Sequence, residues 1–180
     1  MRTELCWVDV TPPGRFAIAP RPRGGDWLAD EMRAWQDAGI DTVVSLLTPD
    51  EVAEFDLGGE AAACAALGMR FVALPIPDRG TPPSRVAFRK LVTDIVEELA
   101  AGRGVAVHCR QGIGRAGLTA AAVLVASGLD TNEAVSRVSA ARGRPVPETP
   151  AQHRWLDGFA GDGRVPVPAV DRHHEDERVL

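Results

Sequence analysis

Several residue types are scarce in this chain of 180 residues, and each scarcity excludes a class of protein. Cysteine occurs only at positions 6, 64 and 109, so neither a disulfide framework nor a zinc-binding spacing is present. No apolar run reaches membrane-spanning length, and the first residues hold no apolar segment typical of a secretory signal. We therefore expect a cytosolic protein without a membrane partner.

Tyrosine is absent, and Lys90 is the only lysine among 20 basic residues. The scarcity of lysine beside abundant alanine is typical of a GC-rich bacterial genome. Acidic residues outnumber basic ones and give a net charge of −5, which disfavours a broad nucleic-acid-binding surface. Hydrophobic residues make up 45% of the chain, an ordinary value for a globular domain with a substantial core.

The chain divides into one long patterned region and a short charged end. Residues 1–160 have the length and composition of a single catalytic domain. Residues 161–180 are punctuated by glycine and proline and then become highly charged, a composition typical of a disordered tail. A tail that binds a metal or a partner is the alternative interpretation.

Strands and helices are predicted to alternate along the catalytic domain. Strands are expected at 6–10, 15–19, 42–47, 71–74 and 104–108, and helices at 26–37, from 48, and at 59–67, 84–101, 115–127, 130–142 and 149–159. This order favours a single α/β domain with a central, mostly parallel sheet flanked by helices. Ligands of such sheets bind at the carboxyl ends of the strands, and Cys109 follows directly after one of them.

The most informative segment reads His-Cys-Arg-Gln-Gly-Ile-Gly-Arg-Ala at positions 108–116, between a strand and a helix. A turn before a helix N-terminus can aim its N–H groups and the helix dipole at a bound oxyanion. Arg115 can clamp two phosphate oxygens with its planar guanidinium. The same positive field favours the nucleophilic thiolate of Cys109. A buried cysteine followed by an ordinary glycine turn is the alternative interpretation.

This segment resembles the signature of the protein tyrosine phosphatase superfamily, which reads His-Cys, five residues, Arg and then Ser or Thr. The resemblance implies a phosphocysteine mechanism, with Cys109 as the nucleophile, Arg115 as the phosphate clamp and no cofactor or metal ion. The phosphate-binding loop would consist of Arg110, Gln111, Gly112, Ile113, Gly114 and Arg115.

A carboxylic acid in a separate loop is expected to protonate the leaving oxygen. Asp78 is the best candidate, because its loop follows the strand 71–74 and would lie at the same edge of a parallel sheet as Cys109. Its loop resembles the general-acid loop of dual-specificity phosphatases, most closely that of the kinase-associated phosphatase (cyclin-dependent kinase inhibitor 3) group. A turn-forming aspartate after a proline is the alternative interpretation.

Three further carboxylates, Asp50, Glu51 and Asp56, compete for the role of the acid. Helix capping explains them better, because Thr48 and Glu51 form a capping box with a proline at the first helical position. They follow the strand 42–47, so their segment could also face the site.

Supporting residues are expected around the loop. His108 would support the loop geometry and the acidity of the cysteine, as in the family, because its side chain points away from that of Cys109 in a regular strand. Gln152 resembles a residue that some family members use near the hydrolytic water, and a surface position in a first helical turn is its alternative. Substrate charge could be read by Arg79, Arg110, Arg142 and Arg144, of which only Arg110 lies inside the loop.

Ala116 departs from the family signature, which has a hydroxyl that donates a hydrogen bond to the cysteine sulfur. A lost hydrogen bond to a charged group costs about 1.5–3 kcal/mol, or roughly tenfold to a hundredfold in rate. Thr119 lies one helical turn further along and is too distant to substitute. We therefore expect an active but slow phosphatase whose second step limits turnover.

Two rival functions differ from this interpretation. A phosphate-recognition module would bind phosphoprotein with little turnover, but the retention of Cys109 and Asp78 argues against it. Another thiolate-loop enzyme, such as an arsenate reductase, would need Cys64 close to the nucleophile. The expected partner is a phosphoprotein or a small phosphate ester, and the lack of a tyrosine-containing substrate loop favours a shallow dual-specificity pocket.

Overall fold

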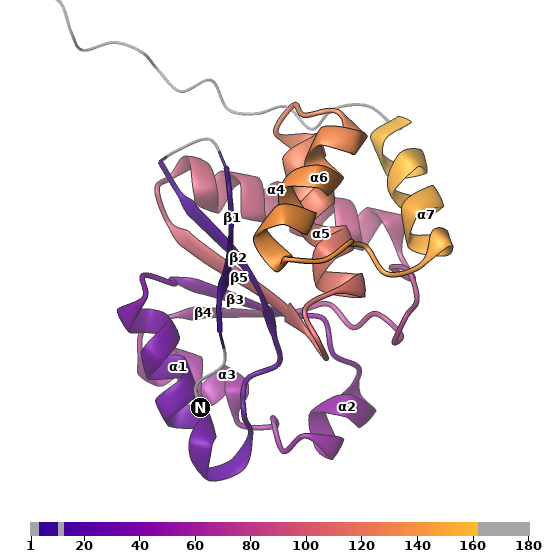
Figure 1. Ribbon diagram of the computed structural model, residues 1–180. Helices are drawn as coiled ribbons and strands as arrows, with labels where there is room; N and C mark the ends of the chain where they lie inside the picture. Colours follow the sequence, from indigo (N-terminus) through magenta and orange to yellow (C-terminus); the bar gives the residue numbers. More distant parts are fainter. Residues whose placement is uncertain (1–3, 11–12, 162–180) are drawn as a thin grey trace, which may run out of the picture.

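The computed structural model describes residues 4–10 and 13–161 (Figure 1). Its strands are β1 (Cys6–Val8), β2 (Arg15–Pro20), β3 (Thr42–Ser45), β4 (Arg70–Ala73) and β5 (Gly104–Cys109). Its helices are the 3-10 turn η1 (Gly25–Trp27), α1 (Leu28–Asp37), α2 (Pro49–Glu54), α3 (Glu60–Ala66), α4 (Arg85–Ala100), α5 (Gly114–Ala126), α6 (Thr131–Arg142) and α7 (Pro150–Gly161). The predicted alternation of strands and helices is confirmed.

The five strands form one sheet in the order β1-β2-β5-β3-β4. Strand β1 pairs antiparallel with β2, and all other neighbours are parallel. Strand β5 lies in the middle, where every one of its residues is buried, as the apolar run Val105–Val107 predicts. The carboxyl ends of β2, β3 and β4 therefore meet beside the carboxyl end of β5, which is Cys109.

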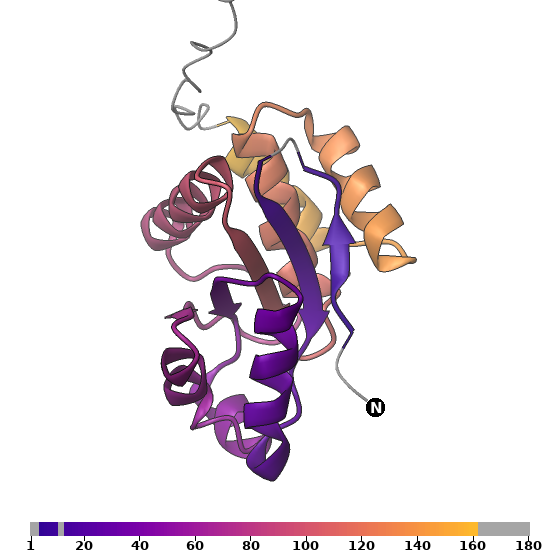
Figure 2. The same ribbon diagram turned by 90° about the vertical axis from the view of Figure 1, so that its left-hand side faces the viewer.

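Helices cover both faces of the sheet (Figures 1 and 2). One face packs against α4, α5 and α6, α7 packs on α5, and together they form the larger hydrophobic cluster, to which Cys109 belongs. The other face packs against α1 and α3 and forms a second cluster around Trp35 and Met32. Helix α5 is buried nearly all round, so the segment that follows the catalytic loop is also the centre of the larger core.

Two predicted helix starts are confirmed and one is wrong. Thr48 and Glu51 form the expected capping box at α2, and the Asp130 carboxylate accepts hydrogen bonds from two backbone N–H groups of α6. Asp26 does not cap α1. It lies inside η1, where the chain tightens so that the N–H of Trp27 donates to the carbonyl of Gly24.

The predicted charged tail, residues 161–180, falls almost wholly beyond the described residues. Helix α7 extends to Gly161, one residue past the predicted domain boundary, and residues 162–180 lie outside the described residues. Within residues 4–10 and 13–161, no helix is long and apolar enough to cross a membrane.

Candidate active site

A small cavity of about 100 Å³ opens at the carboxyl edge of the sheet, where Cys109 ends β5. The phosphate-binding loop contributes most of its lining, and the Asp78 loop and the segment just before α7 close its other sides. The lining residues are Asp78, Arg79, Cys109, Arg110, Gln111, Ile113, Gly114, Arg115 and Glu148. The structure thus brings the predicted nucleophile, clamp and acid together, although they come from segments far apart in the sequence.

The loop before α5 is fixed by close backbone contacts. Gly112 has φ +65°, and a Cβ atom there would lie 2.5 Å from the carbonyl carbon of Ala19 at the end of β2. No side chain fits in that space, so a glycine is required. Arg142, at the end of α6, donates from Nε to the Gly112 carbonyl and from Nη2 to the Gln111 carbonyl. Arg142 therefore holds the outer side of the loop, and a role in reading substrate charge stays a prediction.

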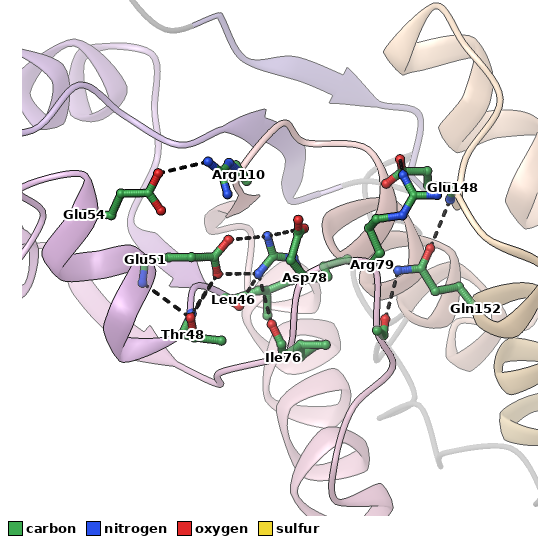
Figure 3. Close-up of polar contacts among 12 residues, drawn as sticks. Leu46, Thr48, Glu51, Glu54, Ile76, Asp78, Arg79, Arg110, Glu148 and Gln152 are labelled. Carbon is green, nitrogen blue, oxygen red and sulfur yellow. Dashed lines mark hydrogen bonds and ion pairs between the residues drawn. The ribbon is translucent and has the colours of Figure 1, made fainter.

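The guanidinium of Arg115 is 1% exposed and is surrounded by acceptors, among which Glu51, Ile76 and Asp78 are labelled in Figure 3. Its two terminal nitrogens donate to the two carboxylate oxygens of Glu51 at 2.6 and 2.8 Å. Nη1 also donates to the Ile76 carbonyl at 2.9 Å, and Nη2 donates to Oδ1 of Asp78 at 2.9 Å. Helix α2 and the Asp78 loop thus converge on one buried charge.

The pairing of Glu51 with Arg115 lowers the pKa of Glu51 and raises the pKa of Arg115. Burial alone would raise the pKa of Glu51, but its hydrogen bonds with Arg115 and Thr48 and the charge of Arg115 outweigh burial and lower it. Burial alone would lower the pKa of Arg115, but hydrogen bonding to Glu51 and the negative charges of Cys109, Glu51 and Asp78 raise it. Both groups are therefore held in their charged forms.

Glu51 is the functional residue that the sequence interpretation missed. The capping box was the visible signal, and the capping contact does exist. The same carboxylate also forms the bidentate pair with Arg115, because α2 follows β3 and β3 lies next to β5. Of the other competing acids, Asp50 is exposed in the first turn of α2 and Asp56 is exposed beyond its end, and neither lines the cavity.

Two ion pairs stand at the mouth of the cavity, on opposite sides (Figure 3). Arg79 contacts Glu148 at 2.7 Å, and Arg110 contacts Glu54 at 2.9 Å. The guanidinium of Arg110 also lies 4.9 Å from the ring centre of Phe55. Arg144 lies in a neighbouring groove that also includes Glu148, and it does not line the catalytic cavity.

Gln152 is fully buried, so the expected alternative of a surface position is wrong. Its side-chain oxygen accepts from the backbone N–H groups of Glu148 and Thr149, and its side-chain nitrogen donates to the Gly80 carbonyl at 2.9 Å. These bonds fasten the acid loop to the start of α7. A role beside the hydrolytic water stays a prediction.

The Thr119 hydroxyl does not replace the hydroxyl that is missing at position 116. Ala116 is fully buried, and the Thr119 hydroxyl donates to the Arg115 carbonyl at 2.9 Å within α5. Thr119 is therefore occupied, in agreement with the expectation that it cannot replace the missing hydroxyl.

The remaining predicted residues lie away from the cavity. His108 contacts Glu60 and Trp35 on the face of α1 and α3, whereas Cys109 belongs to the cluster on the opposite face. Cys64 lies in the second cluster, where burial first and the charge of Glu60 second raise its pKa to about 12. Such a thiol is not a resolving partner for Cys109. Among the described residues, no group of three His, Cys, Asp or Glu side chains could hold a metal ion.

Comparison with known proteins gives a family match over most of this architecture. A family model described as "Polymorphic toxin system, DSP-PTPase phosphatase" matches residues 18–129. That range includes both the Asp78 loop and the phosphate-binding loop. No curated protein matches the chain.

Solved structures with this fold include several phosphatases. The kinase associated phosphatase KAP is 17% identical with a TM-score of 0.79, over 90% of this chain and 96% of that one. Tk-PTP is 29% identical with a TM-score of 0.68, over 83% of this chain and 93% of that one. PTPMT1 in complex with PI(5)P is 17% identical with a TM-score of 0.68, over 82% and 90%. The likenesses to KAP and PTPMT1 show the fold.

The substitution Glu51→Gln tests the clamp on Arg115. It leaves a buried guanidinium without its charge partner, so we expect the free energy of unfolding at pH 7 to fall by about 3–5 kcal/mol in urea titrations. Because the folded-state pKa of Glu51 is lowered from the ordinary 4.5, its contribution is fully present above pH 4.5 and is lost as the pH falls through the lower folded value. The difference between the wild type and the variant should shrink over that acidic range.

Glu54→Gln is the matched control on the same helix, since the ion pair that Glu54 forms within the described part of the chain is the exposed one with Arg110. Loss of the Glu54 carboxylate should lower the free energy of unfolding by less than about 1 kcal/mol, and this difference should not shrink over the acidic range as it does for Glu51→Gln. If both variants lowered the free energy of unfolding equally, Glu51 would not be the charge partner that holds Arg115.

Proposed function

The chain belongs to the DSP-PTPase phosphatase family of polymorphic toxin systems, and we propose that it hydrolyses phosphomonoesters through a phosphocysteine formed on Cys109. As a member, it is a phosphatase of the protein tyrosine and dual-specificity type. The observation that carries the proposed mechanism is the convergence of Cys109, Arg115 and Asp78 on one small cavity. No other cavity described above combines a thiol, a buried guanidinium and a carboxylate.

Phosphate binding would begin with an exchange at Arg115. A guanidinium has five N–H groups, and the contacts among described residues use those of the two terminal nitrogens. A phosphate oxygen that binds Nη2 would displace Asp78, while Glu51 keeps the guanidinium in place from behind. The released Asp78 carboxylate, which is half exposed, is then free to take up a proton beside the leaving oxygen.

The first chemical step would transfer the phosphoryl group to the sulfur. The Cys109 thiolate attacks phosphorus, the bond between phosphorus and the ester oxygen breaks, and Asp78 gives its proton to that oxygen. In the second step water attacks the phosphocysteine, Asp78 accepts a proton from the water, and the thiolate leaves. Arg115 and the loop N–H groups stabilise the charge that develops on the phosphoryl oxygens in both steps.

Ala116 is the reason to propose a slow second step. The departing thiolate receives no hydroxyl hydrogen bond from position 116, and Thr119 is bonded to the backbone. A missing bond to a charged group raises the barrier by about 1.5–3 kcal/mol. The methyl group leaves the nucleophile, the clamp and the acid in place, so turnover would be reduced instead of abolished.

The substrate would be a phosphoprotein or a small phosphate ester. Among the described residues, no Phe, Trp or Tyr lines the cavity, which favours a pocket that does not select phosphotyrosine by its ring. PTPMT1 has been crystallised with PI(5)P, so phosphoinositides are candidate substrates. The sequence around Asp78 supports a place near the KAP group. A reducing, intracellular compartment would keep the Cys109 thiolate active.

The function is tested by phosphate release from a panel of phosphotyrosine, phosphoserine and phosphothreonine peptides, phosphoinositides and aryl phosphates. At least one class should be hydrolysed, and Cys109→Ser should abolish release because a hydroxyl is far less nucleophilic than a thiolate. Tight binding of phosphopeptides without any cysteine-dependent release would instead identify a phosphate-recognition module.

The role of Asp78 is tested with leaving groups of different quality. Asp78→Asn should slow the hydrolysis of alkyl phosphates by roughly 100-fold or more, because an alkoxide needs a proton to depart. Activated aryl phosphates should be affected far less in the first step. Asp50→Asn, which changes a nearby exposed carboxylate outside the cavity, should leave both rates unchanged. If Asp78→Asn slowed the hydrolysis of all these phosphates equally, Asp78 would not be the general acid.

Pre-steady-state kinetics test the slow second step. With an aryl phosphate, the wild type should release a burst of leaving group equal to the enzyme concentration and then turn over slowly. Ala116→Ser should raise the steady rate by roughly tenfold or more by restoring the hydrogen bond. Ala120→Ser adds a hydroxyl at another buried alanine of α5 and should not speed turnover. Fast steady turnover without a burst would contradict the proposal.

A further inference from the structure

An open groove lies beside the catalytic cavity, and the reaction described above does not use it. Its volume is about 520 Å³, against about 100 Å³ for the cavity. Gln111, Ile113 and Glu148 line both spaces, so the groove and the cavity are continuous. The rest of the groove is lined by the segment 144–150, between α6 and α7, and by His153. A substrate whose phosphoryl group lies in the cavity therefore has the groove next to its remaining atoms.

The wall of the groove is made rigid by its sequence. Pro145, Pro147 and Pro150 fix three φ angles within six residues. Between them, Val146 is 1% exposed and packs against α5 at Gly117, where a Cβ atom would lie 2.7 Å from the Val146 Cβ. This contact holds the segment between α6 and α7 beside the helix that follows the phosphate-binding loop (Figure 1). A preformed wall loses little conformational entropy when a ligand binds.

Arg144 reaches the groove from the end of α6. Gly143 ends that helix with φ +70°, and the backbone N–H of Arg144 donates to the Ser139 carbonyl at 3.2 Å. The following Pro145 also disfavours a helical backbone at Arg144. The backbone that carries this guanidinium is therefore fixed, while its side chain is exposed to solvent.

The charges that line the groove are not balanced. Glu148 pairs with Arg79 at 2.7 Å (Figure 3), so its negative charge is already matched. Nε2 of His153 lies 3.1 Å from the Pro147 carbonyl oxygen. Within residues 4–10 and 13–161, no hydrogen bond or ion pair involves the side chain of Arg144. The groove thus presents an unmatched positive charge beside the cavity.

We propose that the groove is a substrate subsite, which binds the peptide segment beside a phosphorylated residue and pairs Arg144 with an acidic or phosphorylated side chain of that segment. The substrate class is then a phosphoprotein with an anionic flank. Proline rings and Ile113 offer apolar surface to an extended peptide, and an anionic side chain supplies the charge that Arg144 lacks. An inositol phosphate carries hydroxyl and phosphate groups alone, and such a surface does not match a wall of prolines with one arginine.

The proposal rests on the proposed function in one respect, which is that the catalytic cavity holds the phosphate. It does not require hydrolysis, so it is tested by binding. Isothermal titration calorimetry measures the affinity of Cys109→Ser for phosphotyrosine and phosphoserine peptides in which a single glutamate is moved through the positions on both sides of the phosphorylated residue. At one or more positions, glutamate should bind about two- to fivefold more tightly than glutamine, the range of an exposed ion pair.

Variants in the same Cys109→Ser background identify the cation. The preference for glutamate should disappear in Arg144→Gln and should reverse to a preference for lysine in Arg144→Glu. Arg154→Gln is the matched control, because Arg154 is an exposed arginine of α7 that does not line the groove, and it should keep the preference. Equal loss in Arg144→Gln and Arg154→Gln, or no position that depends on Arg144, would overturn the proposal.

Soluble inositol phosphates form the second arm of the titration. They should bind more weakly than the best flanked phosphopeptide, and tighter binding of an inositol phosphate than of every peptide would contradict the subsite, as would a complete lack of phosphopeptide binding. A wild type that hydrolyses none of the peptides, in a protein whose binding preference depends on Arg144, would contradict the proposed hydrolysis and leave the subsite in place.

Discussion

A guanidinium that is only 1% exposed has to be neutralised where it lies, and the active site is arranged around that requirement. An isolated buried charge costs far more than a domain of this size can tolerate. Arg115 is therefore bound by the bidentate carboxylate of Glu51, by the Ile76 carbonyl and by Asp78. Removing water from the guanidinium makes it a strong phosphate ligand, and the same absence of water makes its protein partners indispensable.

The requirement also explains why three segments meet at this edge of the sheet. The strand order places β3 directly beside β5 and β4 beside β3, all parallel. The chain that leaves β3 becomes α2 and delivers Glu51, and the chain that leaves β4 delivers Asp78. The N–H of Ile76 donates to the Leu46 carbonyl, which continues the strand pairing into the acid loop. Because the strands are parallel and adjacent, segments that are distant in sequence all lie next to the Arg115 guanidinium.

The sequence predicted the parts of the site that depend on local pattern. Cys109, Arg115 and the strand-to-helix context lie within nine residues, and Asp78 follows from a loop after a neighbouring strand. For Glu51 the sequence favours helix capping and leaves open only that its segment faces the site, because its pairing with Arg115 depends on strand order, which no local pattern encodes. The bonds of Gln152 to Gly80 and of Arg142 to the loop carbonyls could not be predicted for the same reason, since they join segments 30 or more residues apart.

The methyl group at position 116 is then less disruptive than the signature suggests. In the proposed mechanism, stabilisation of the Cys109 thiolate would come from several sources: the N-terminus of α5, the Arg115 guanidinium and the loop N–H groups. None of these passes through the side chain of residue 116. The hydroxyl matters most when sulfur departs from phosphorus, because negative charge returns to the sulfur at that moment.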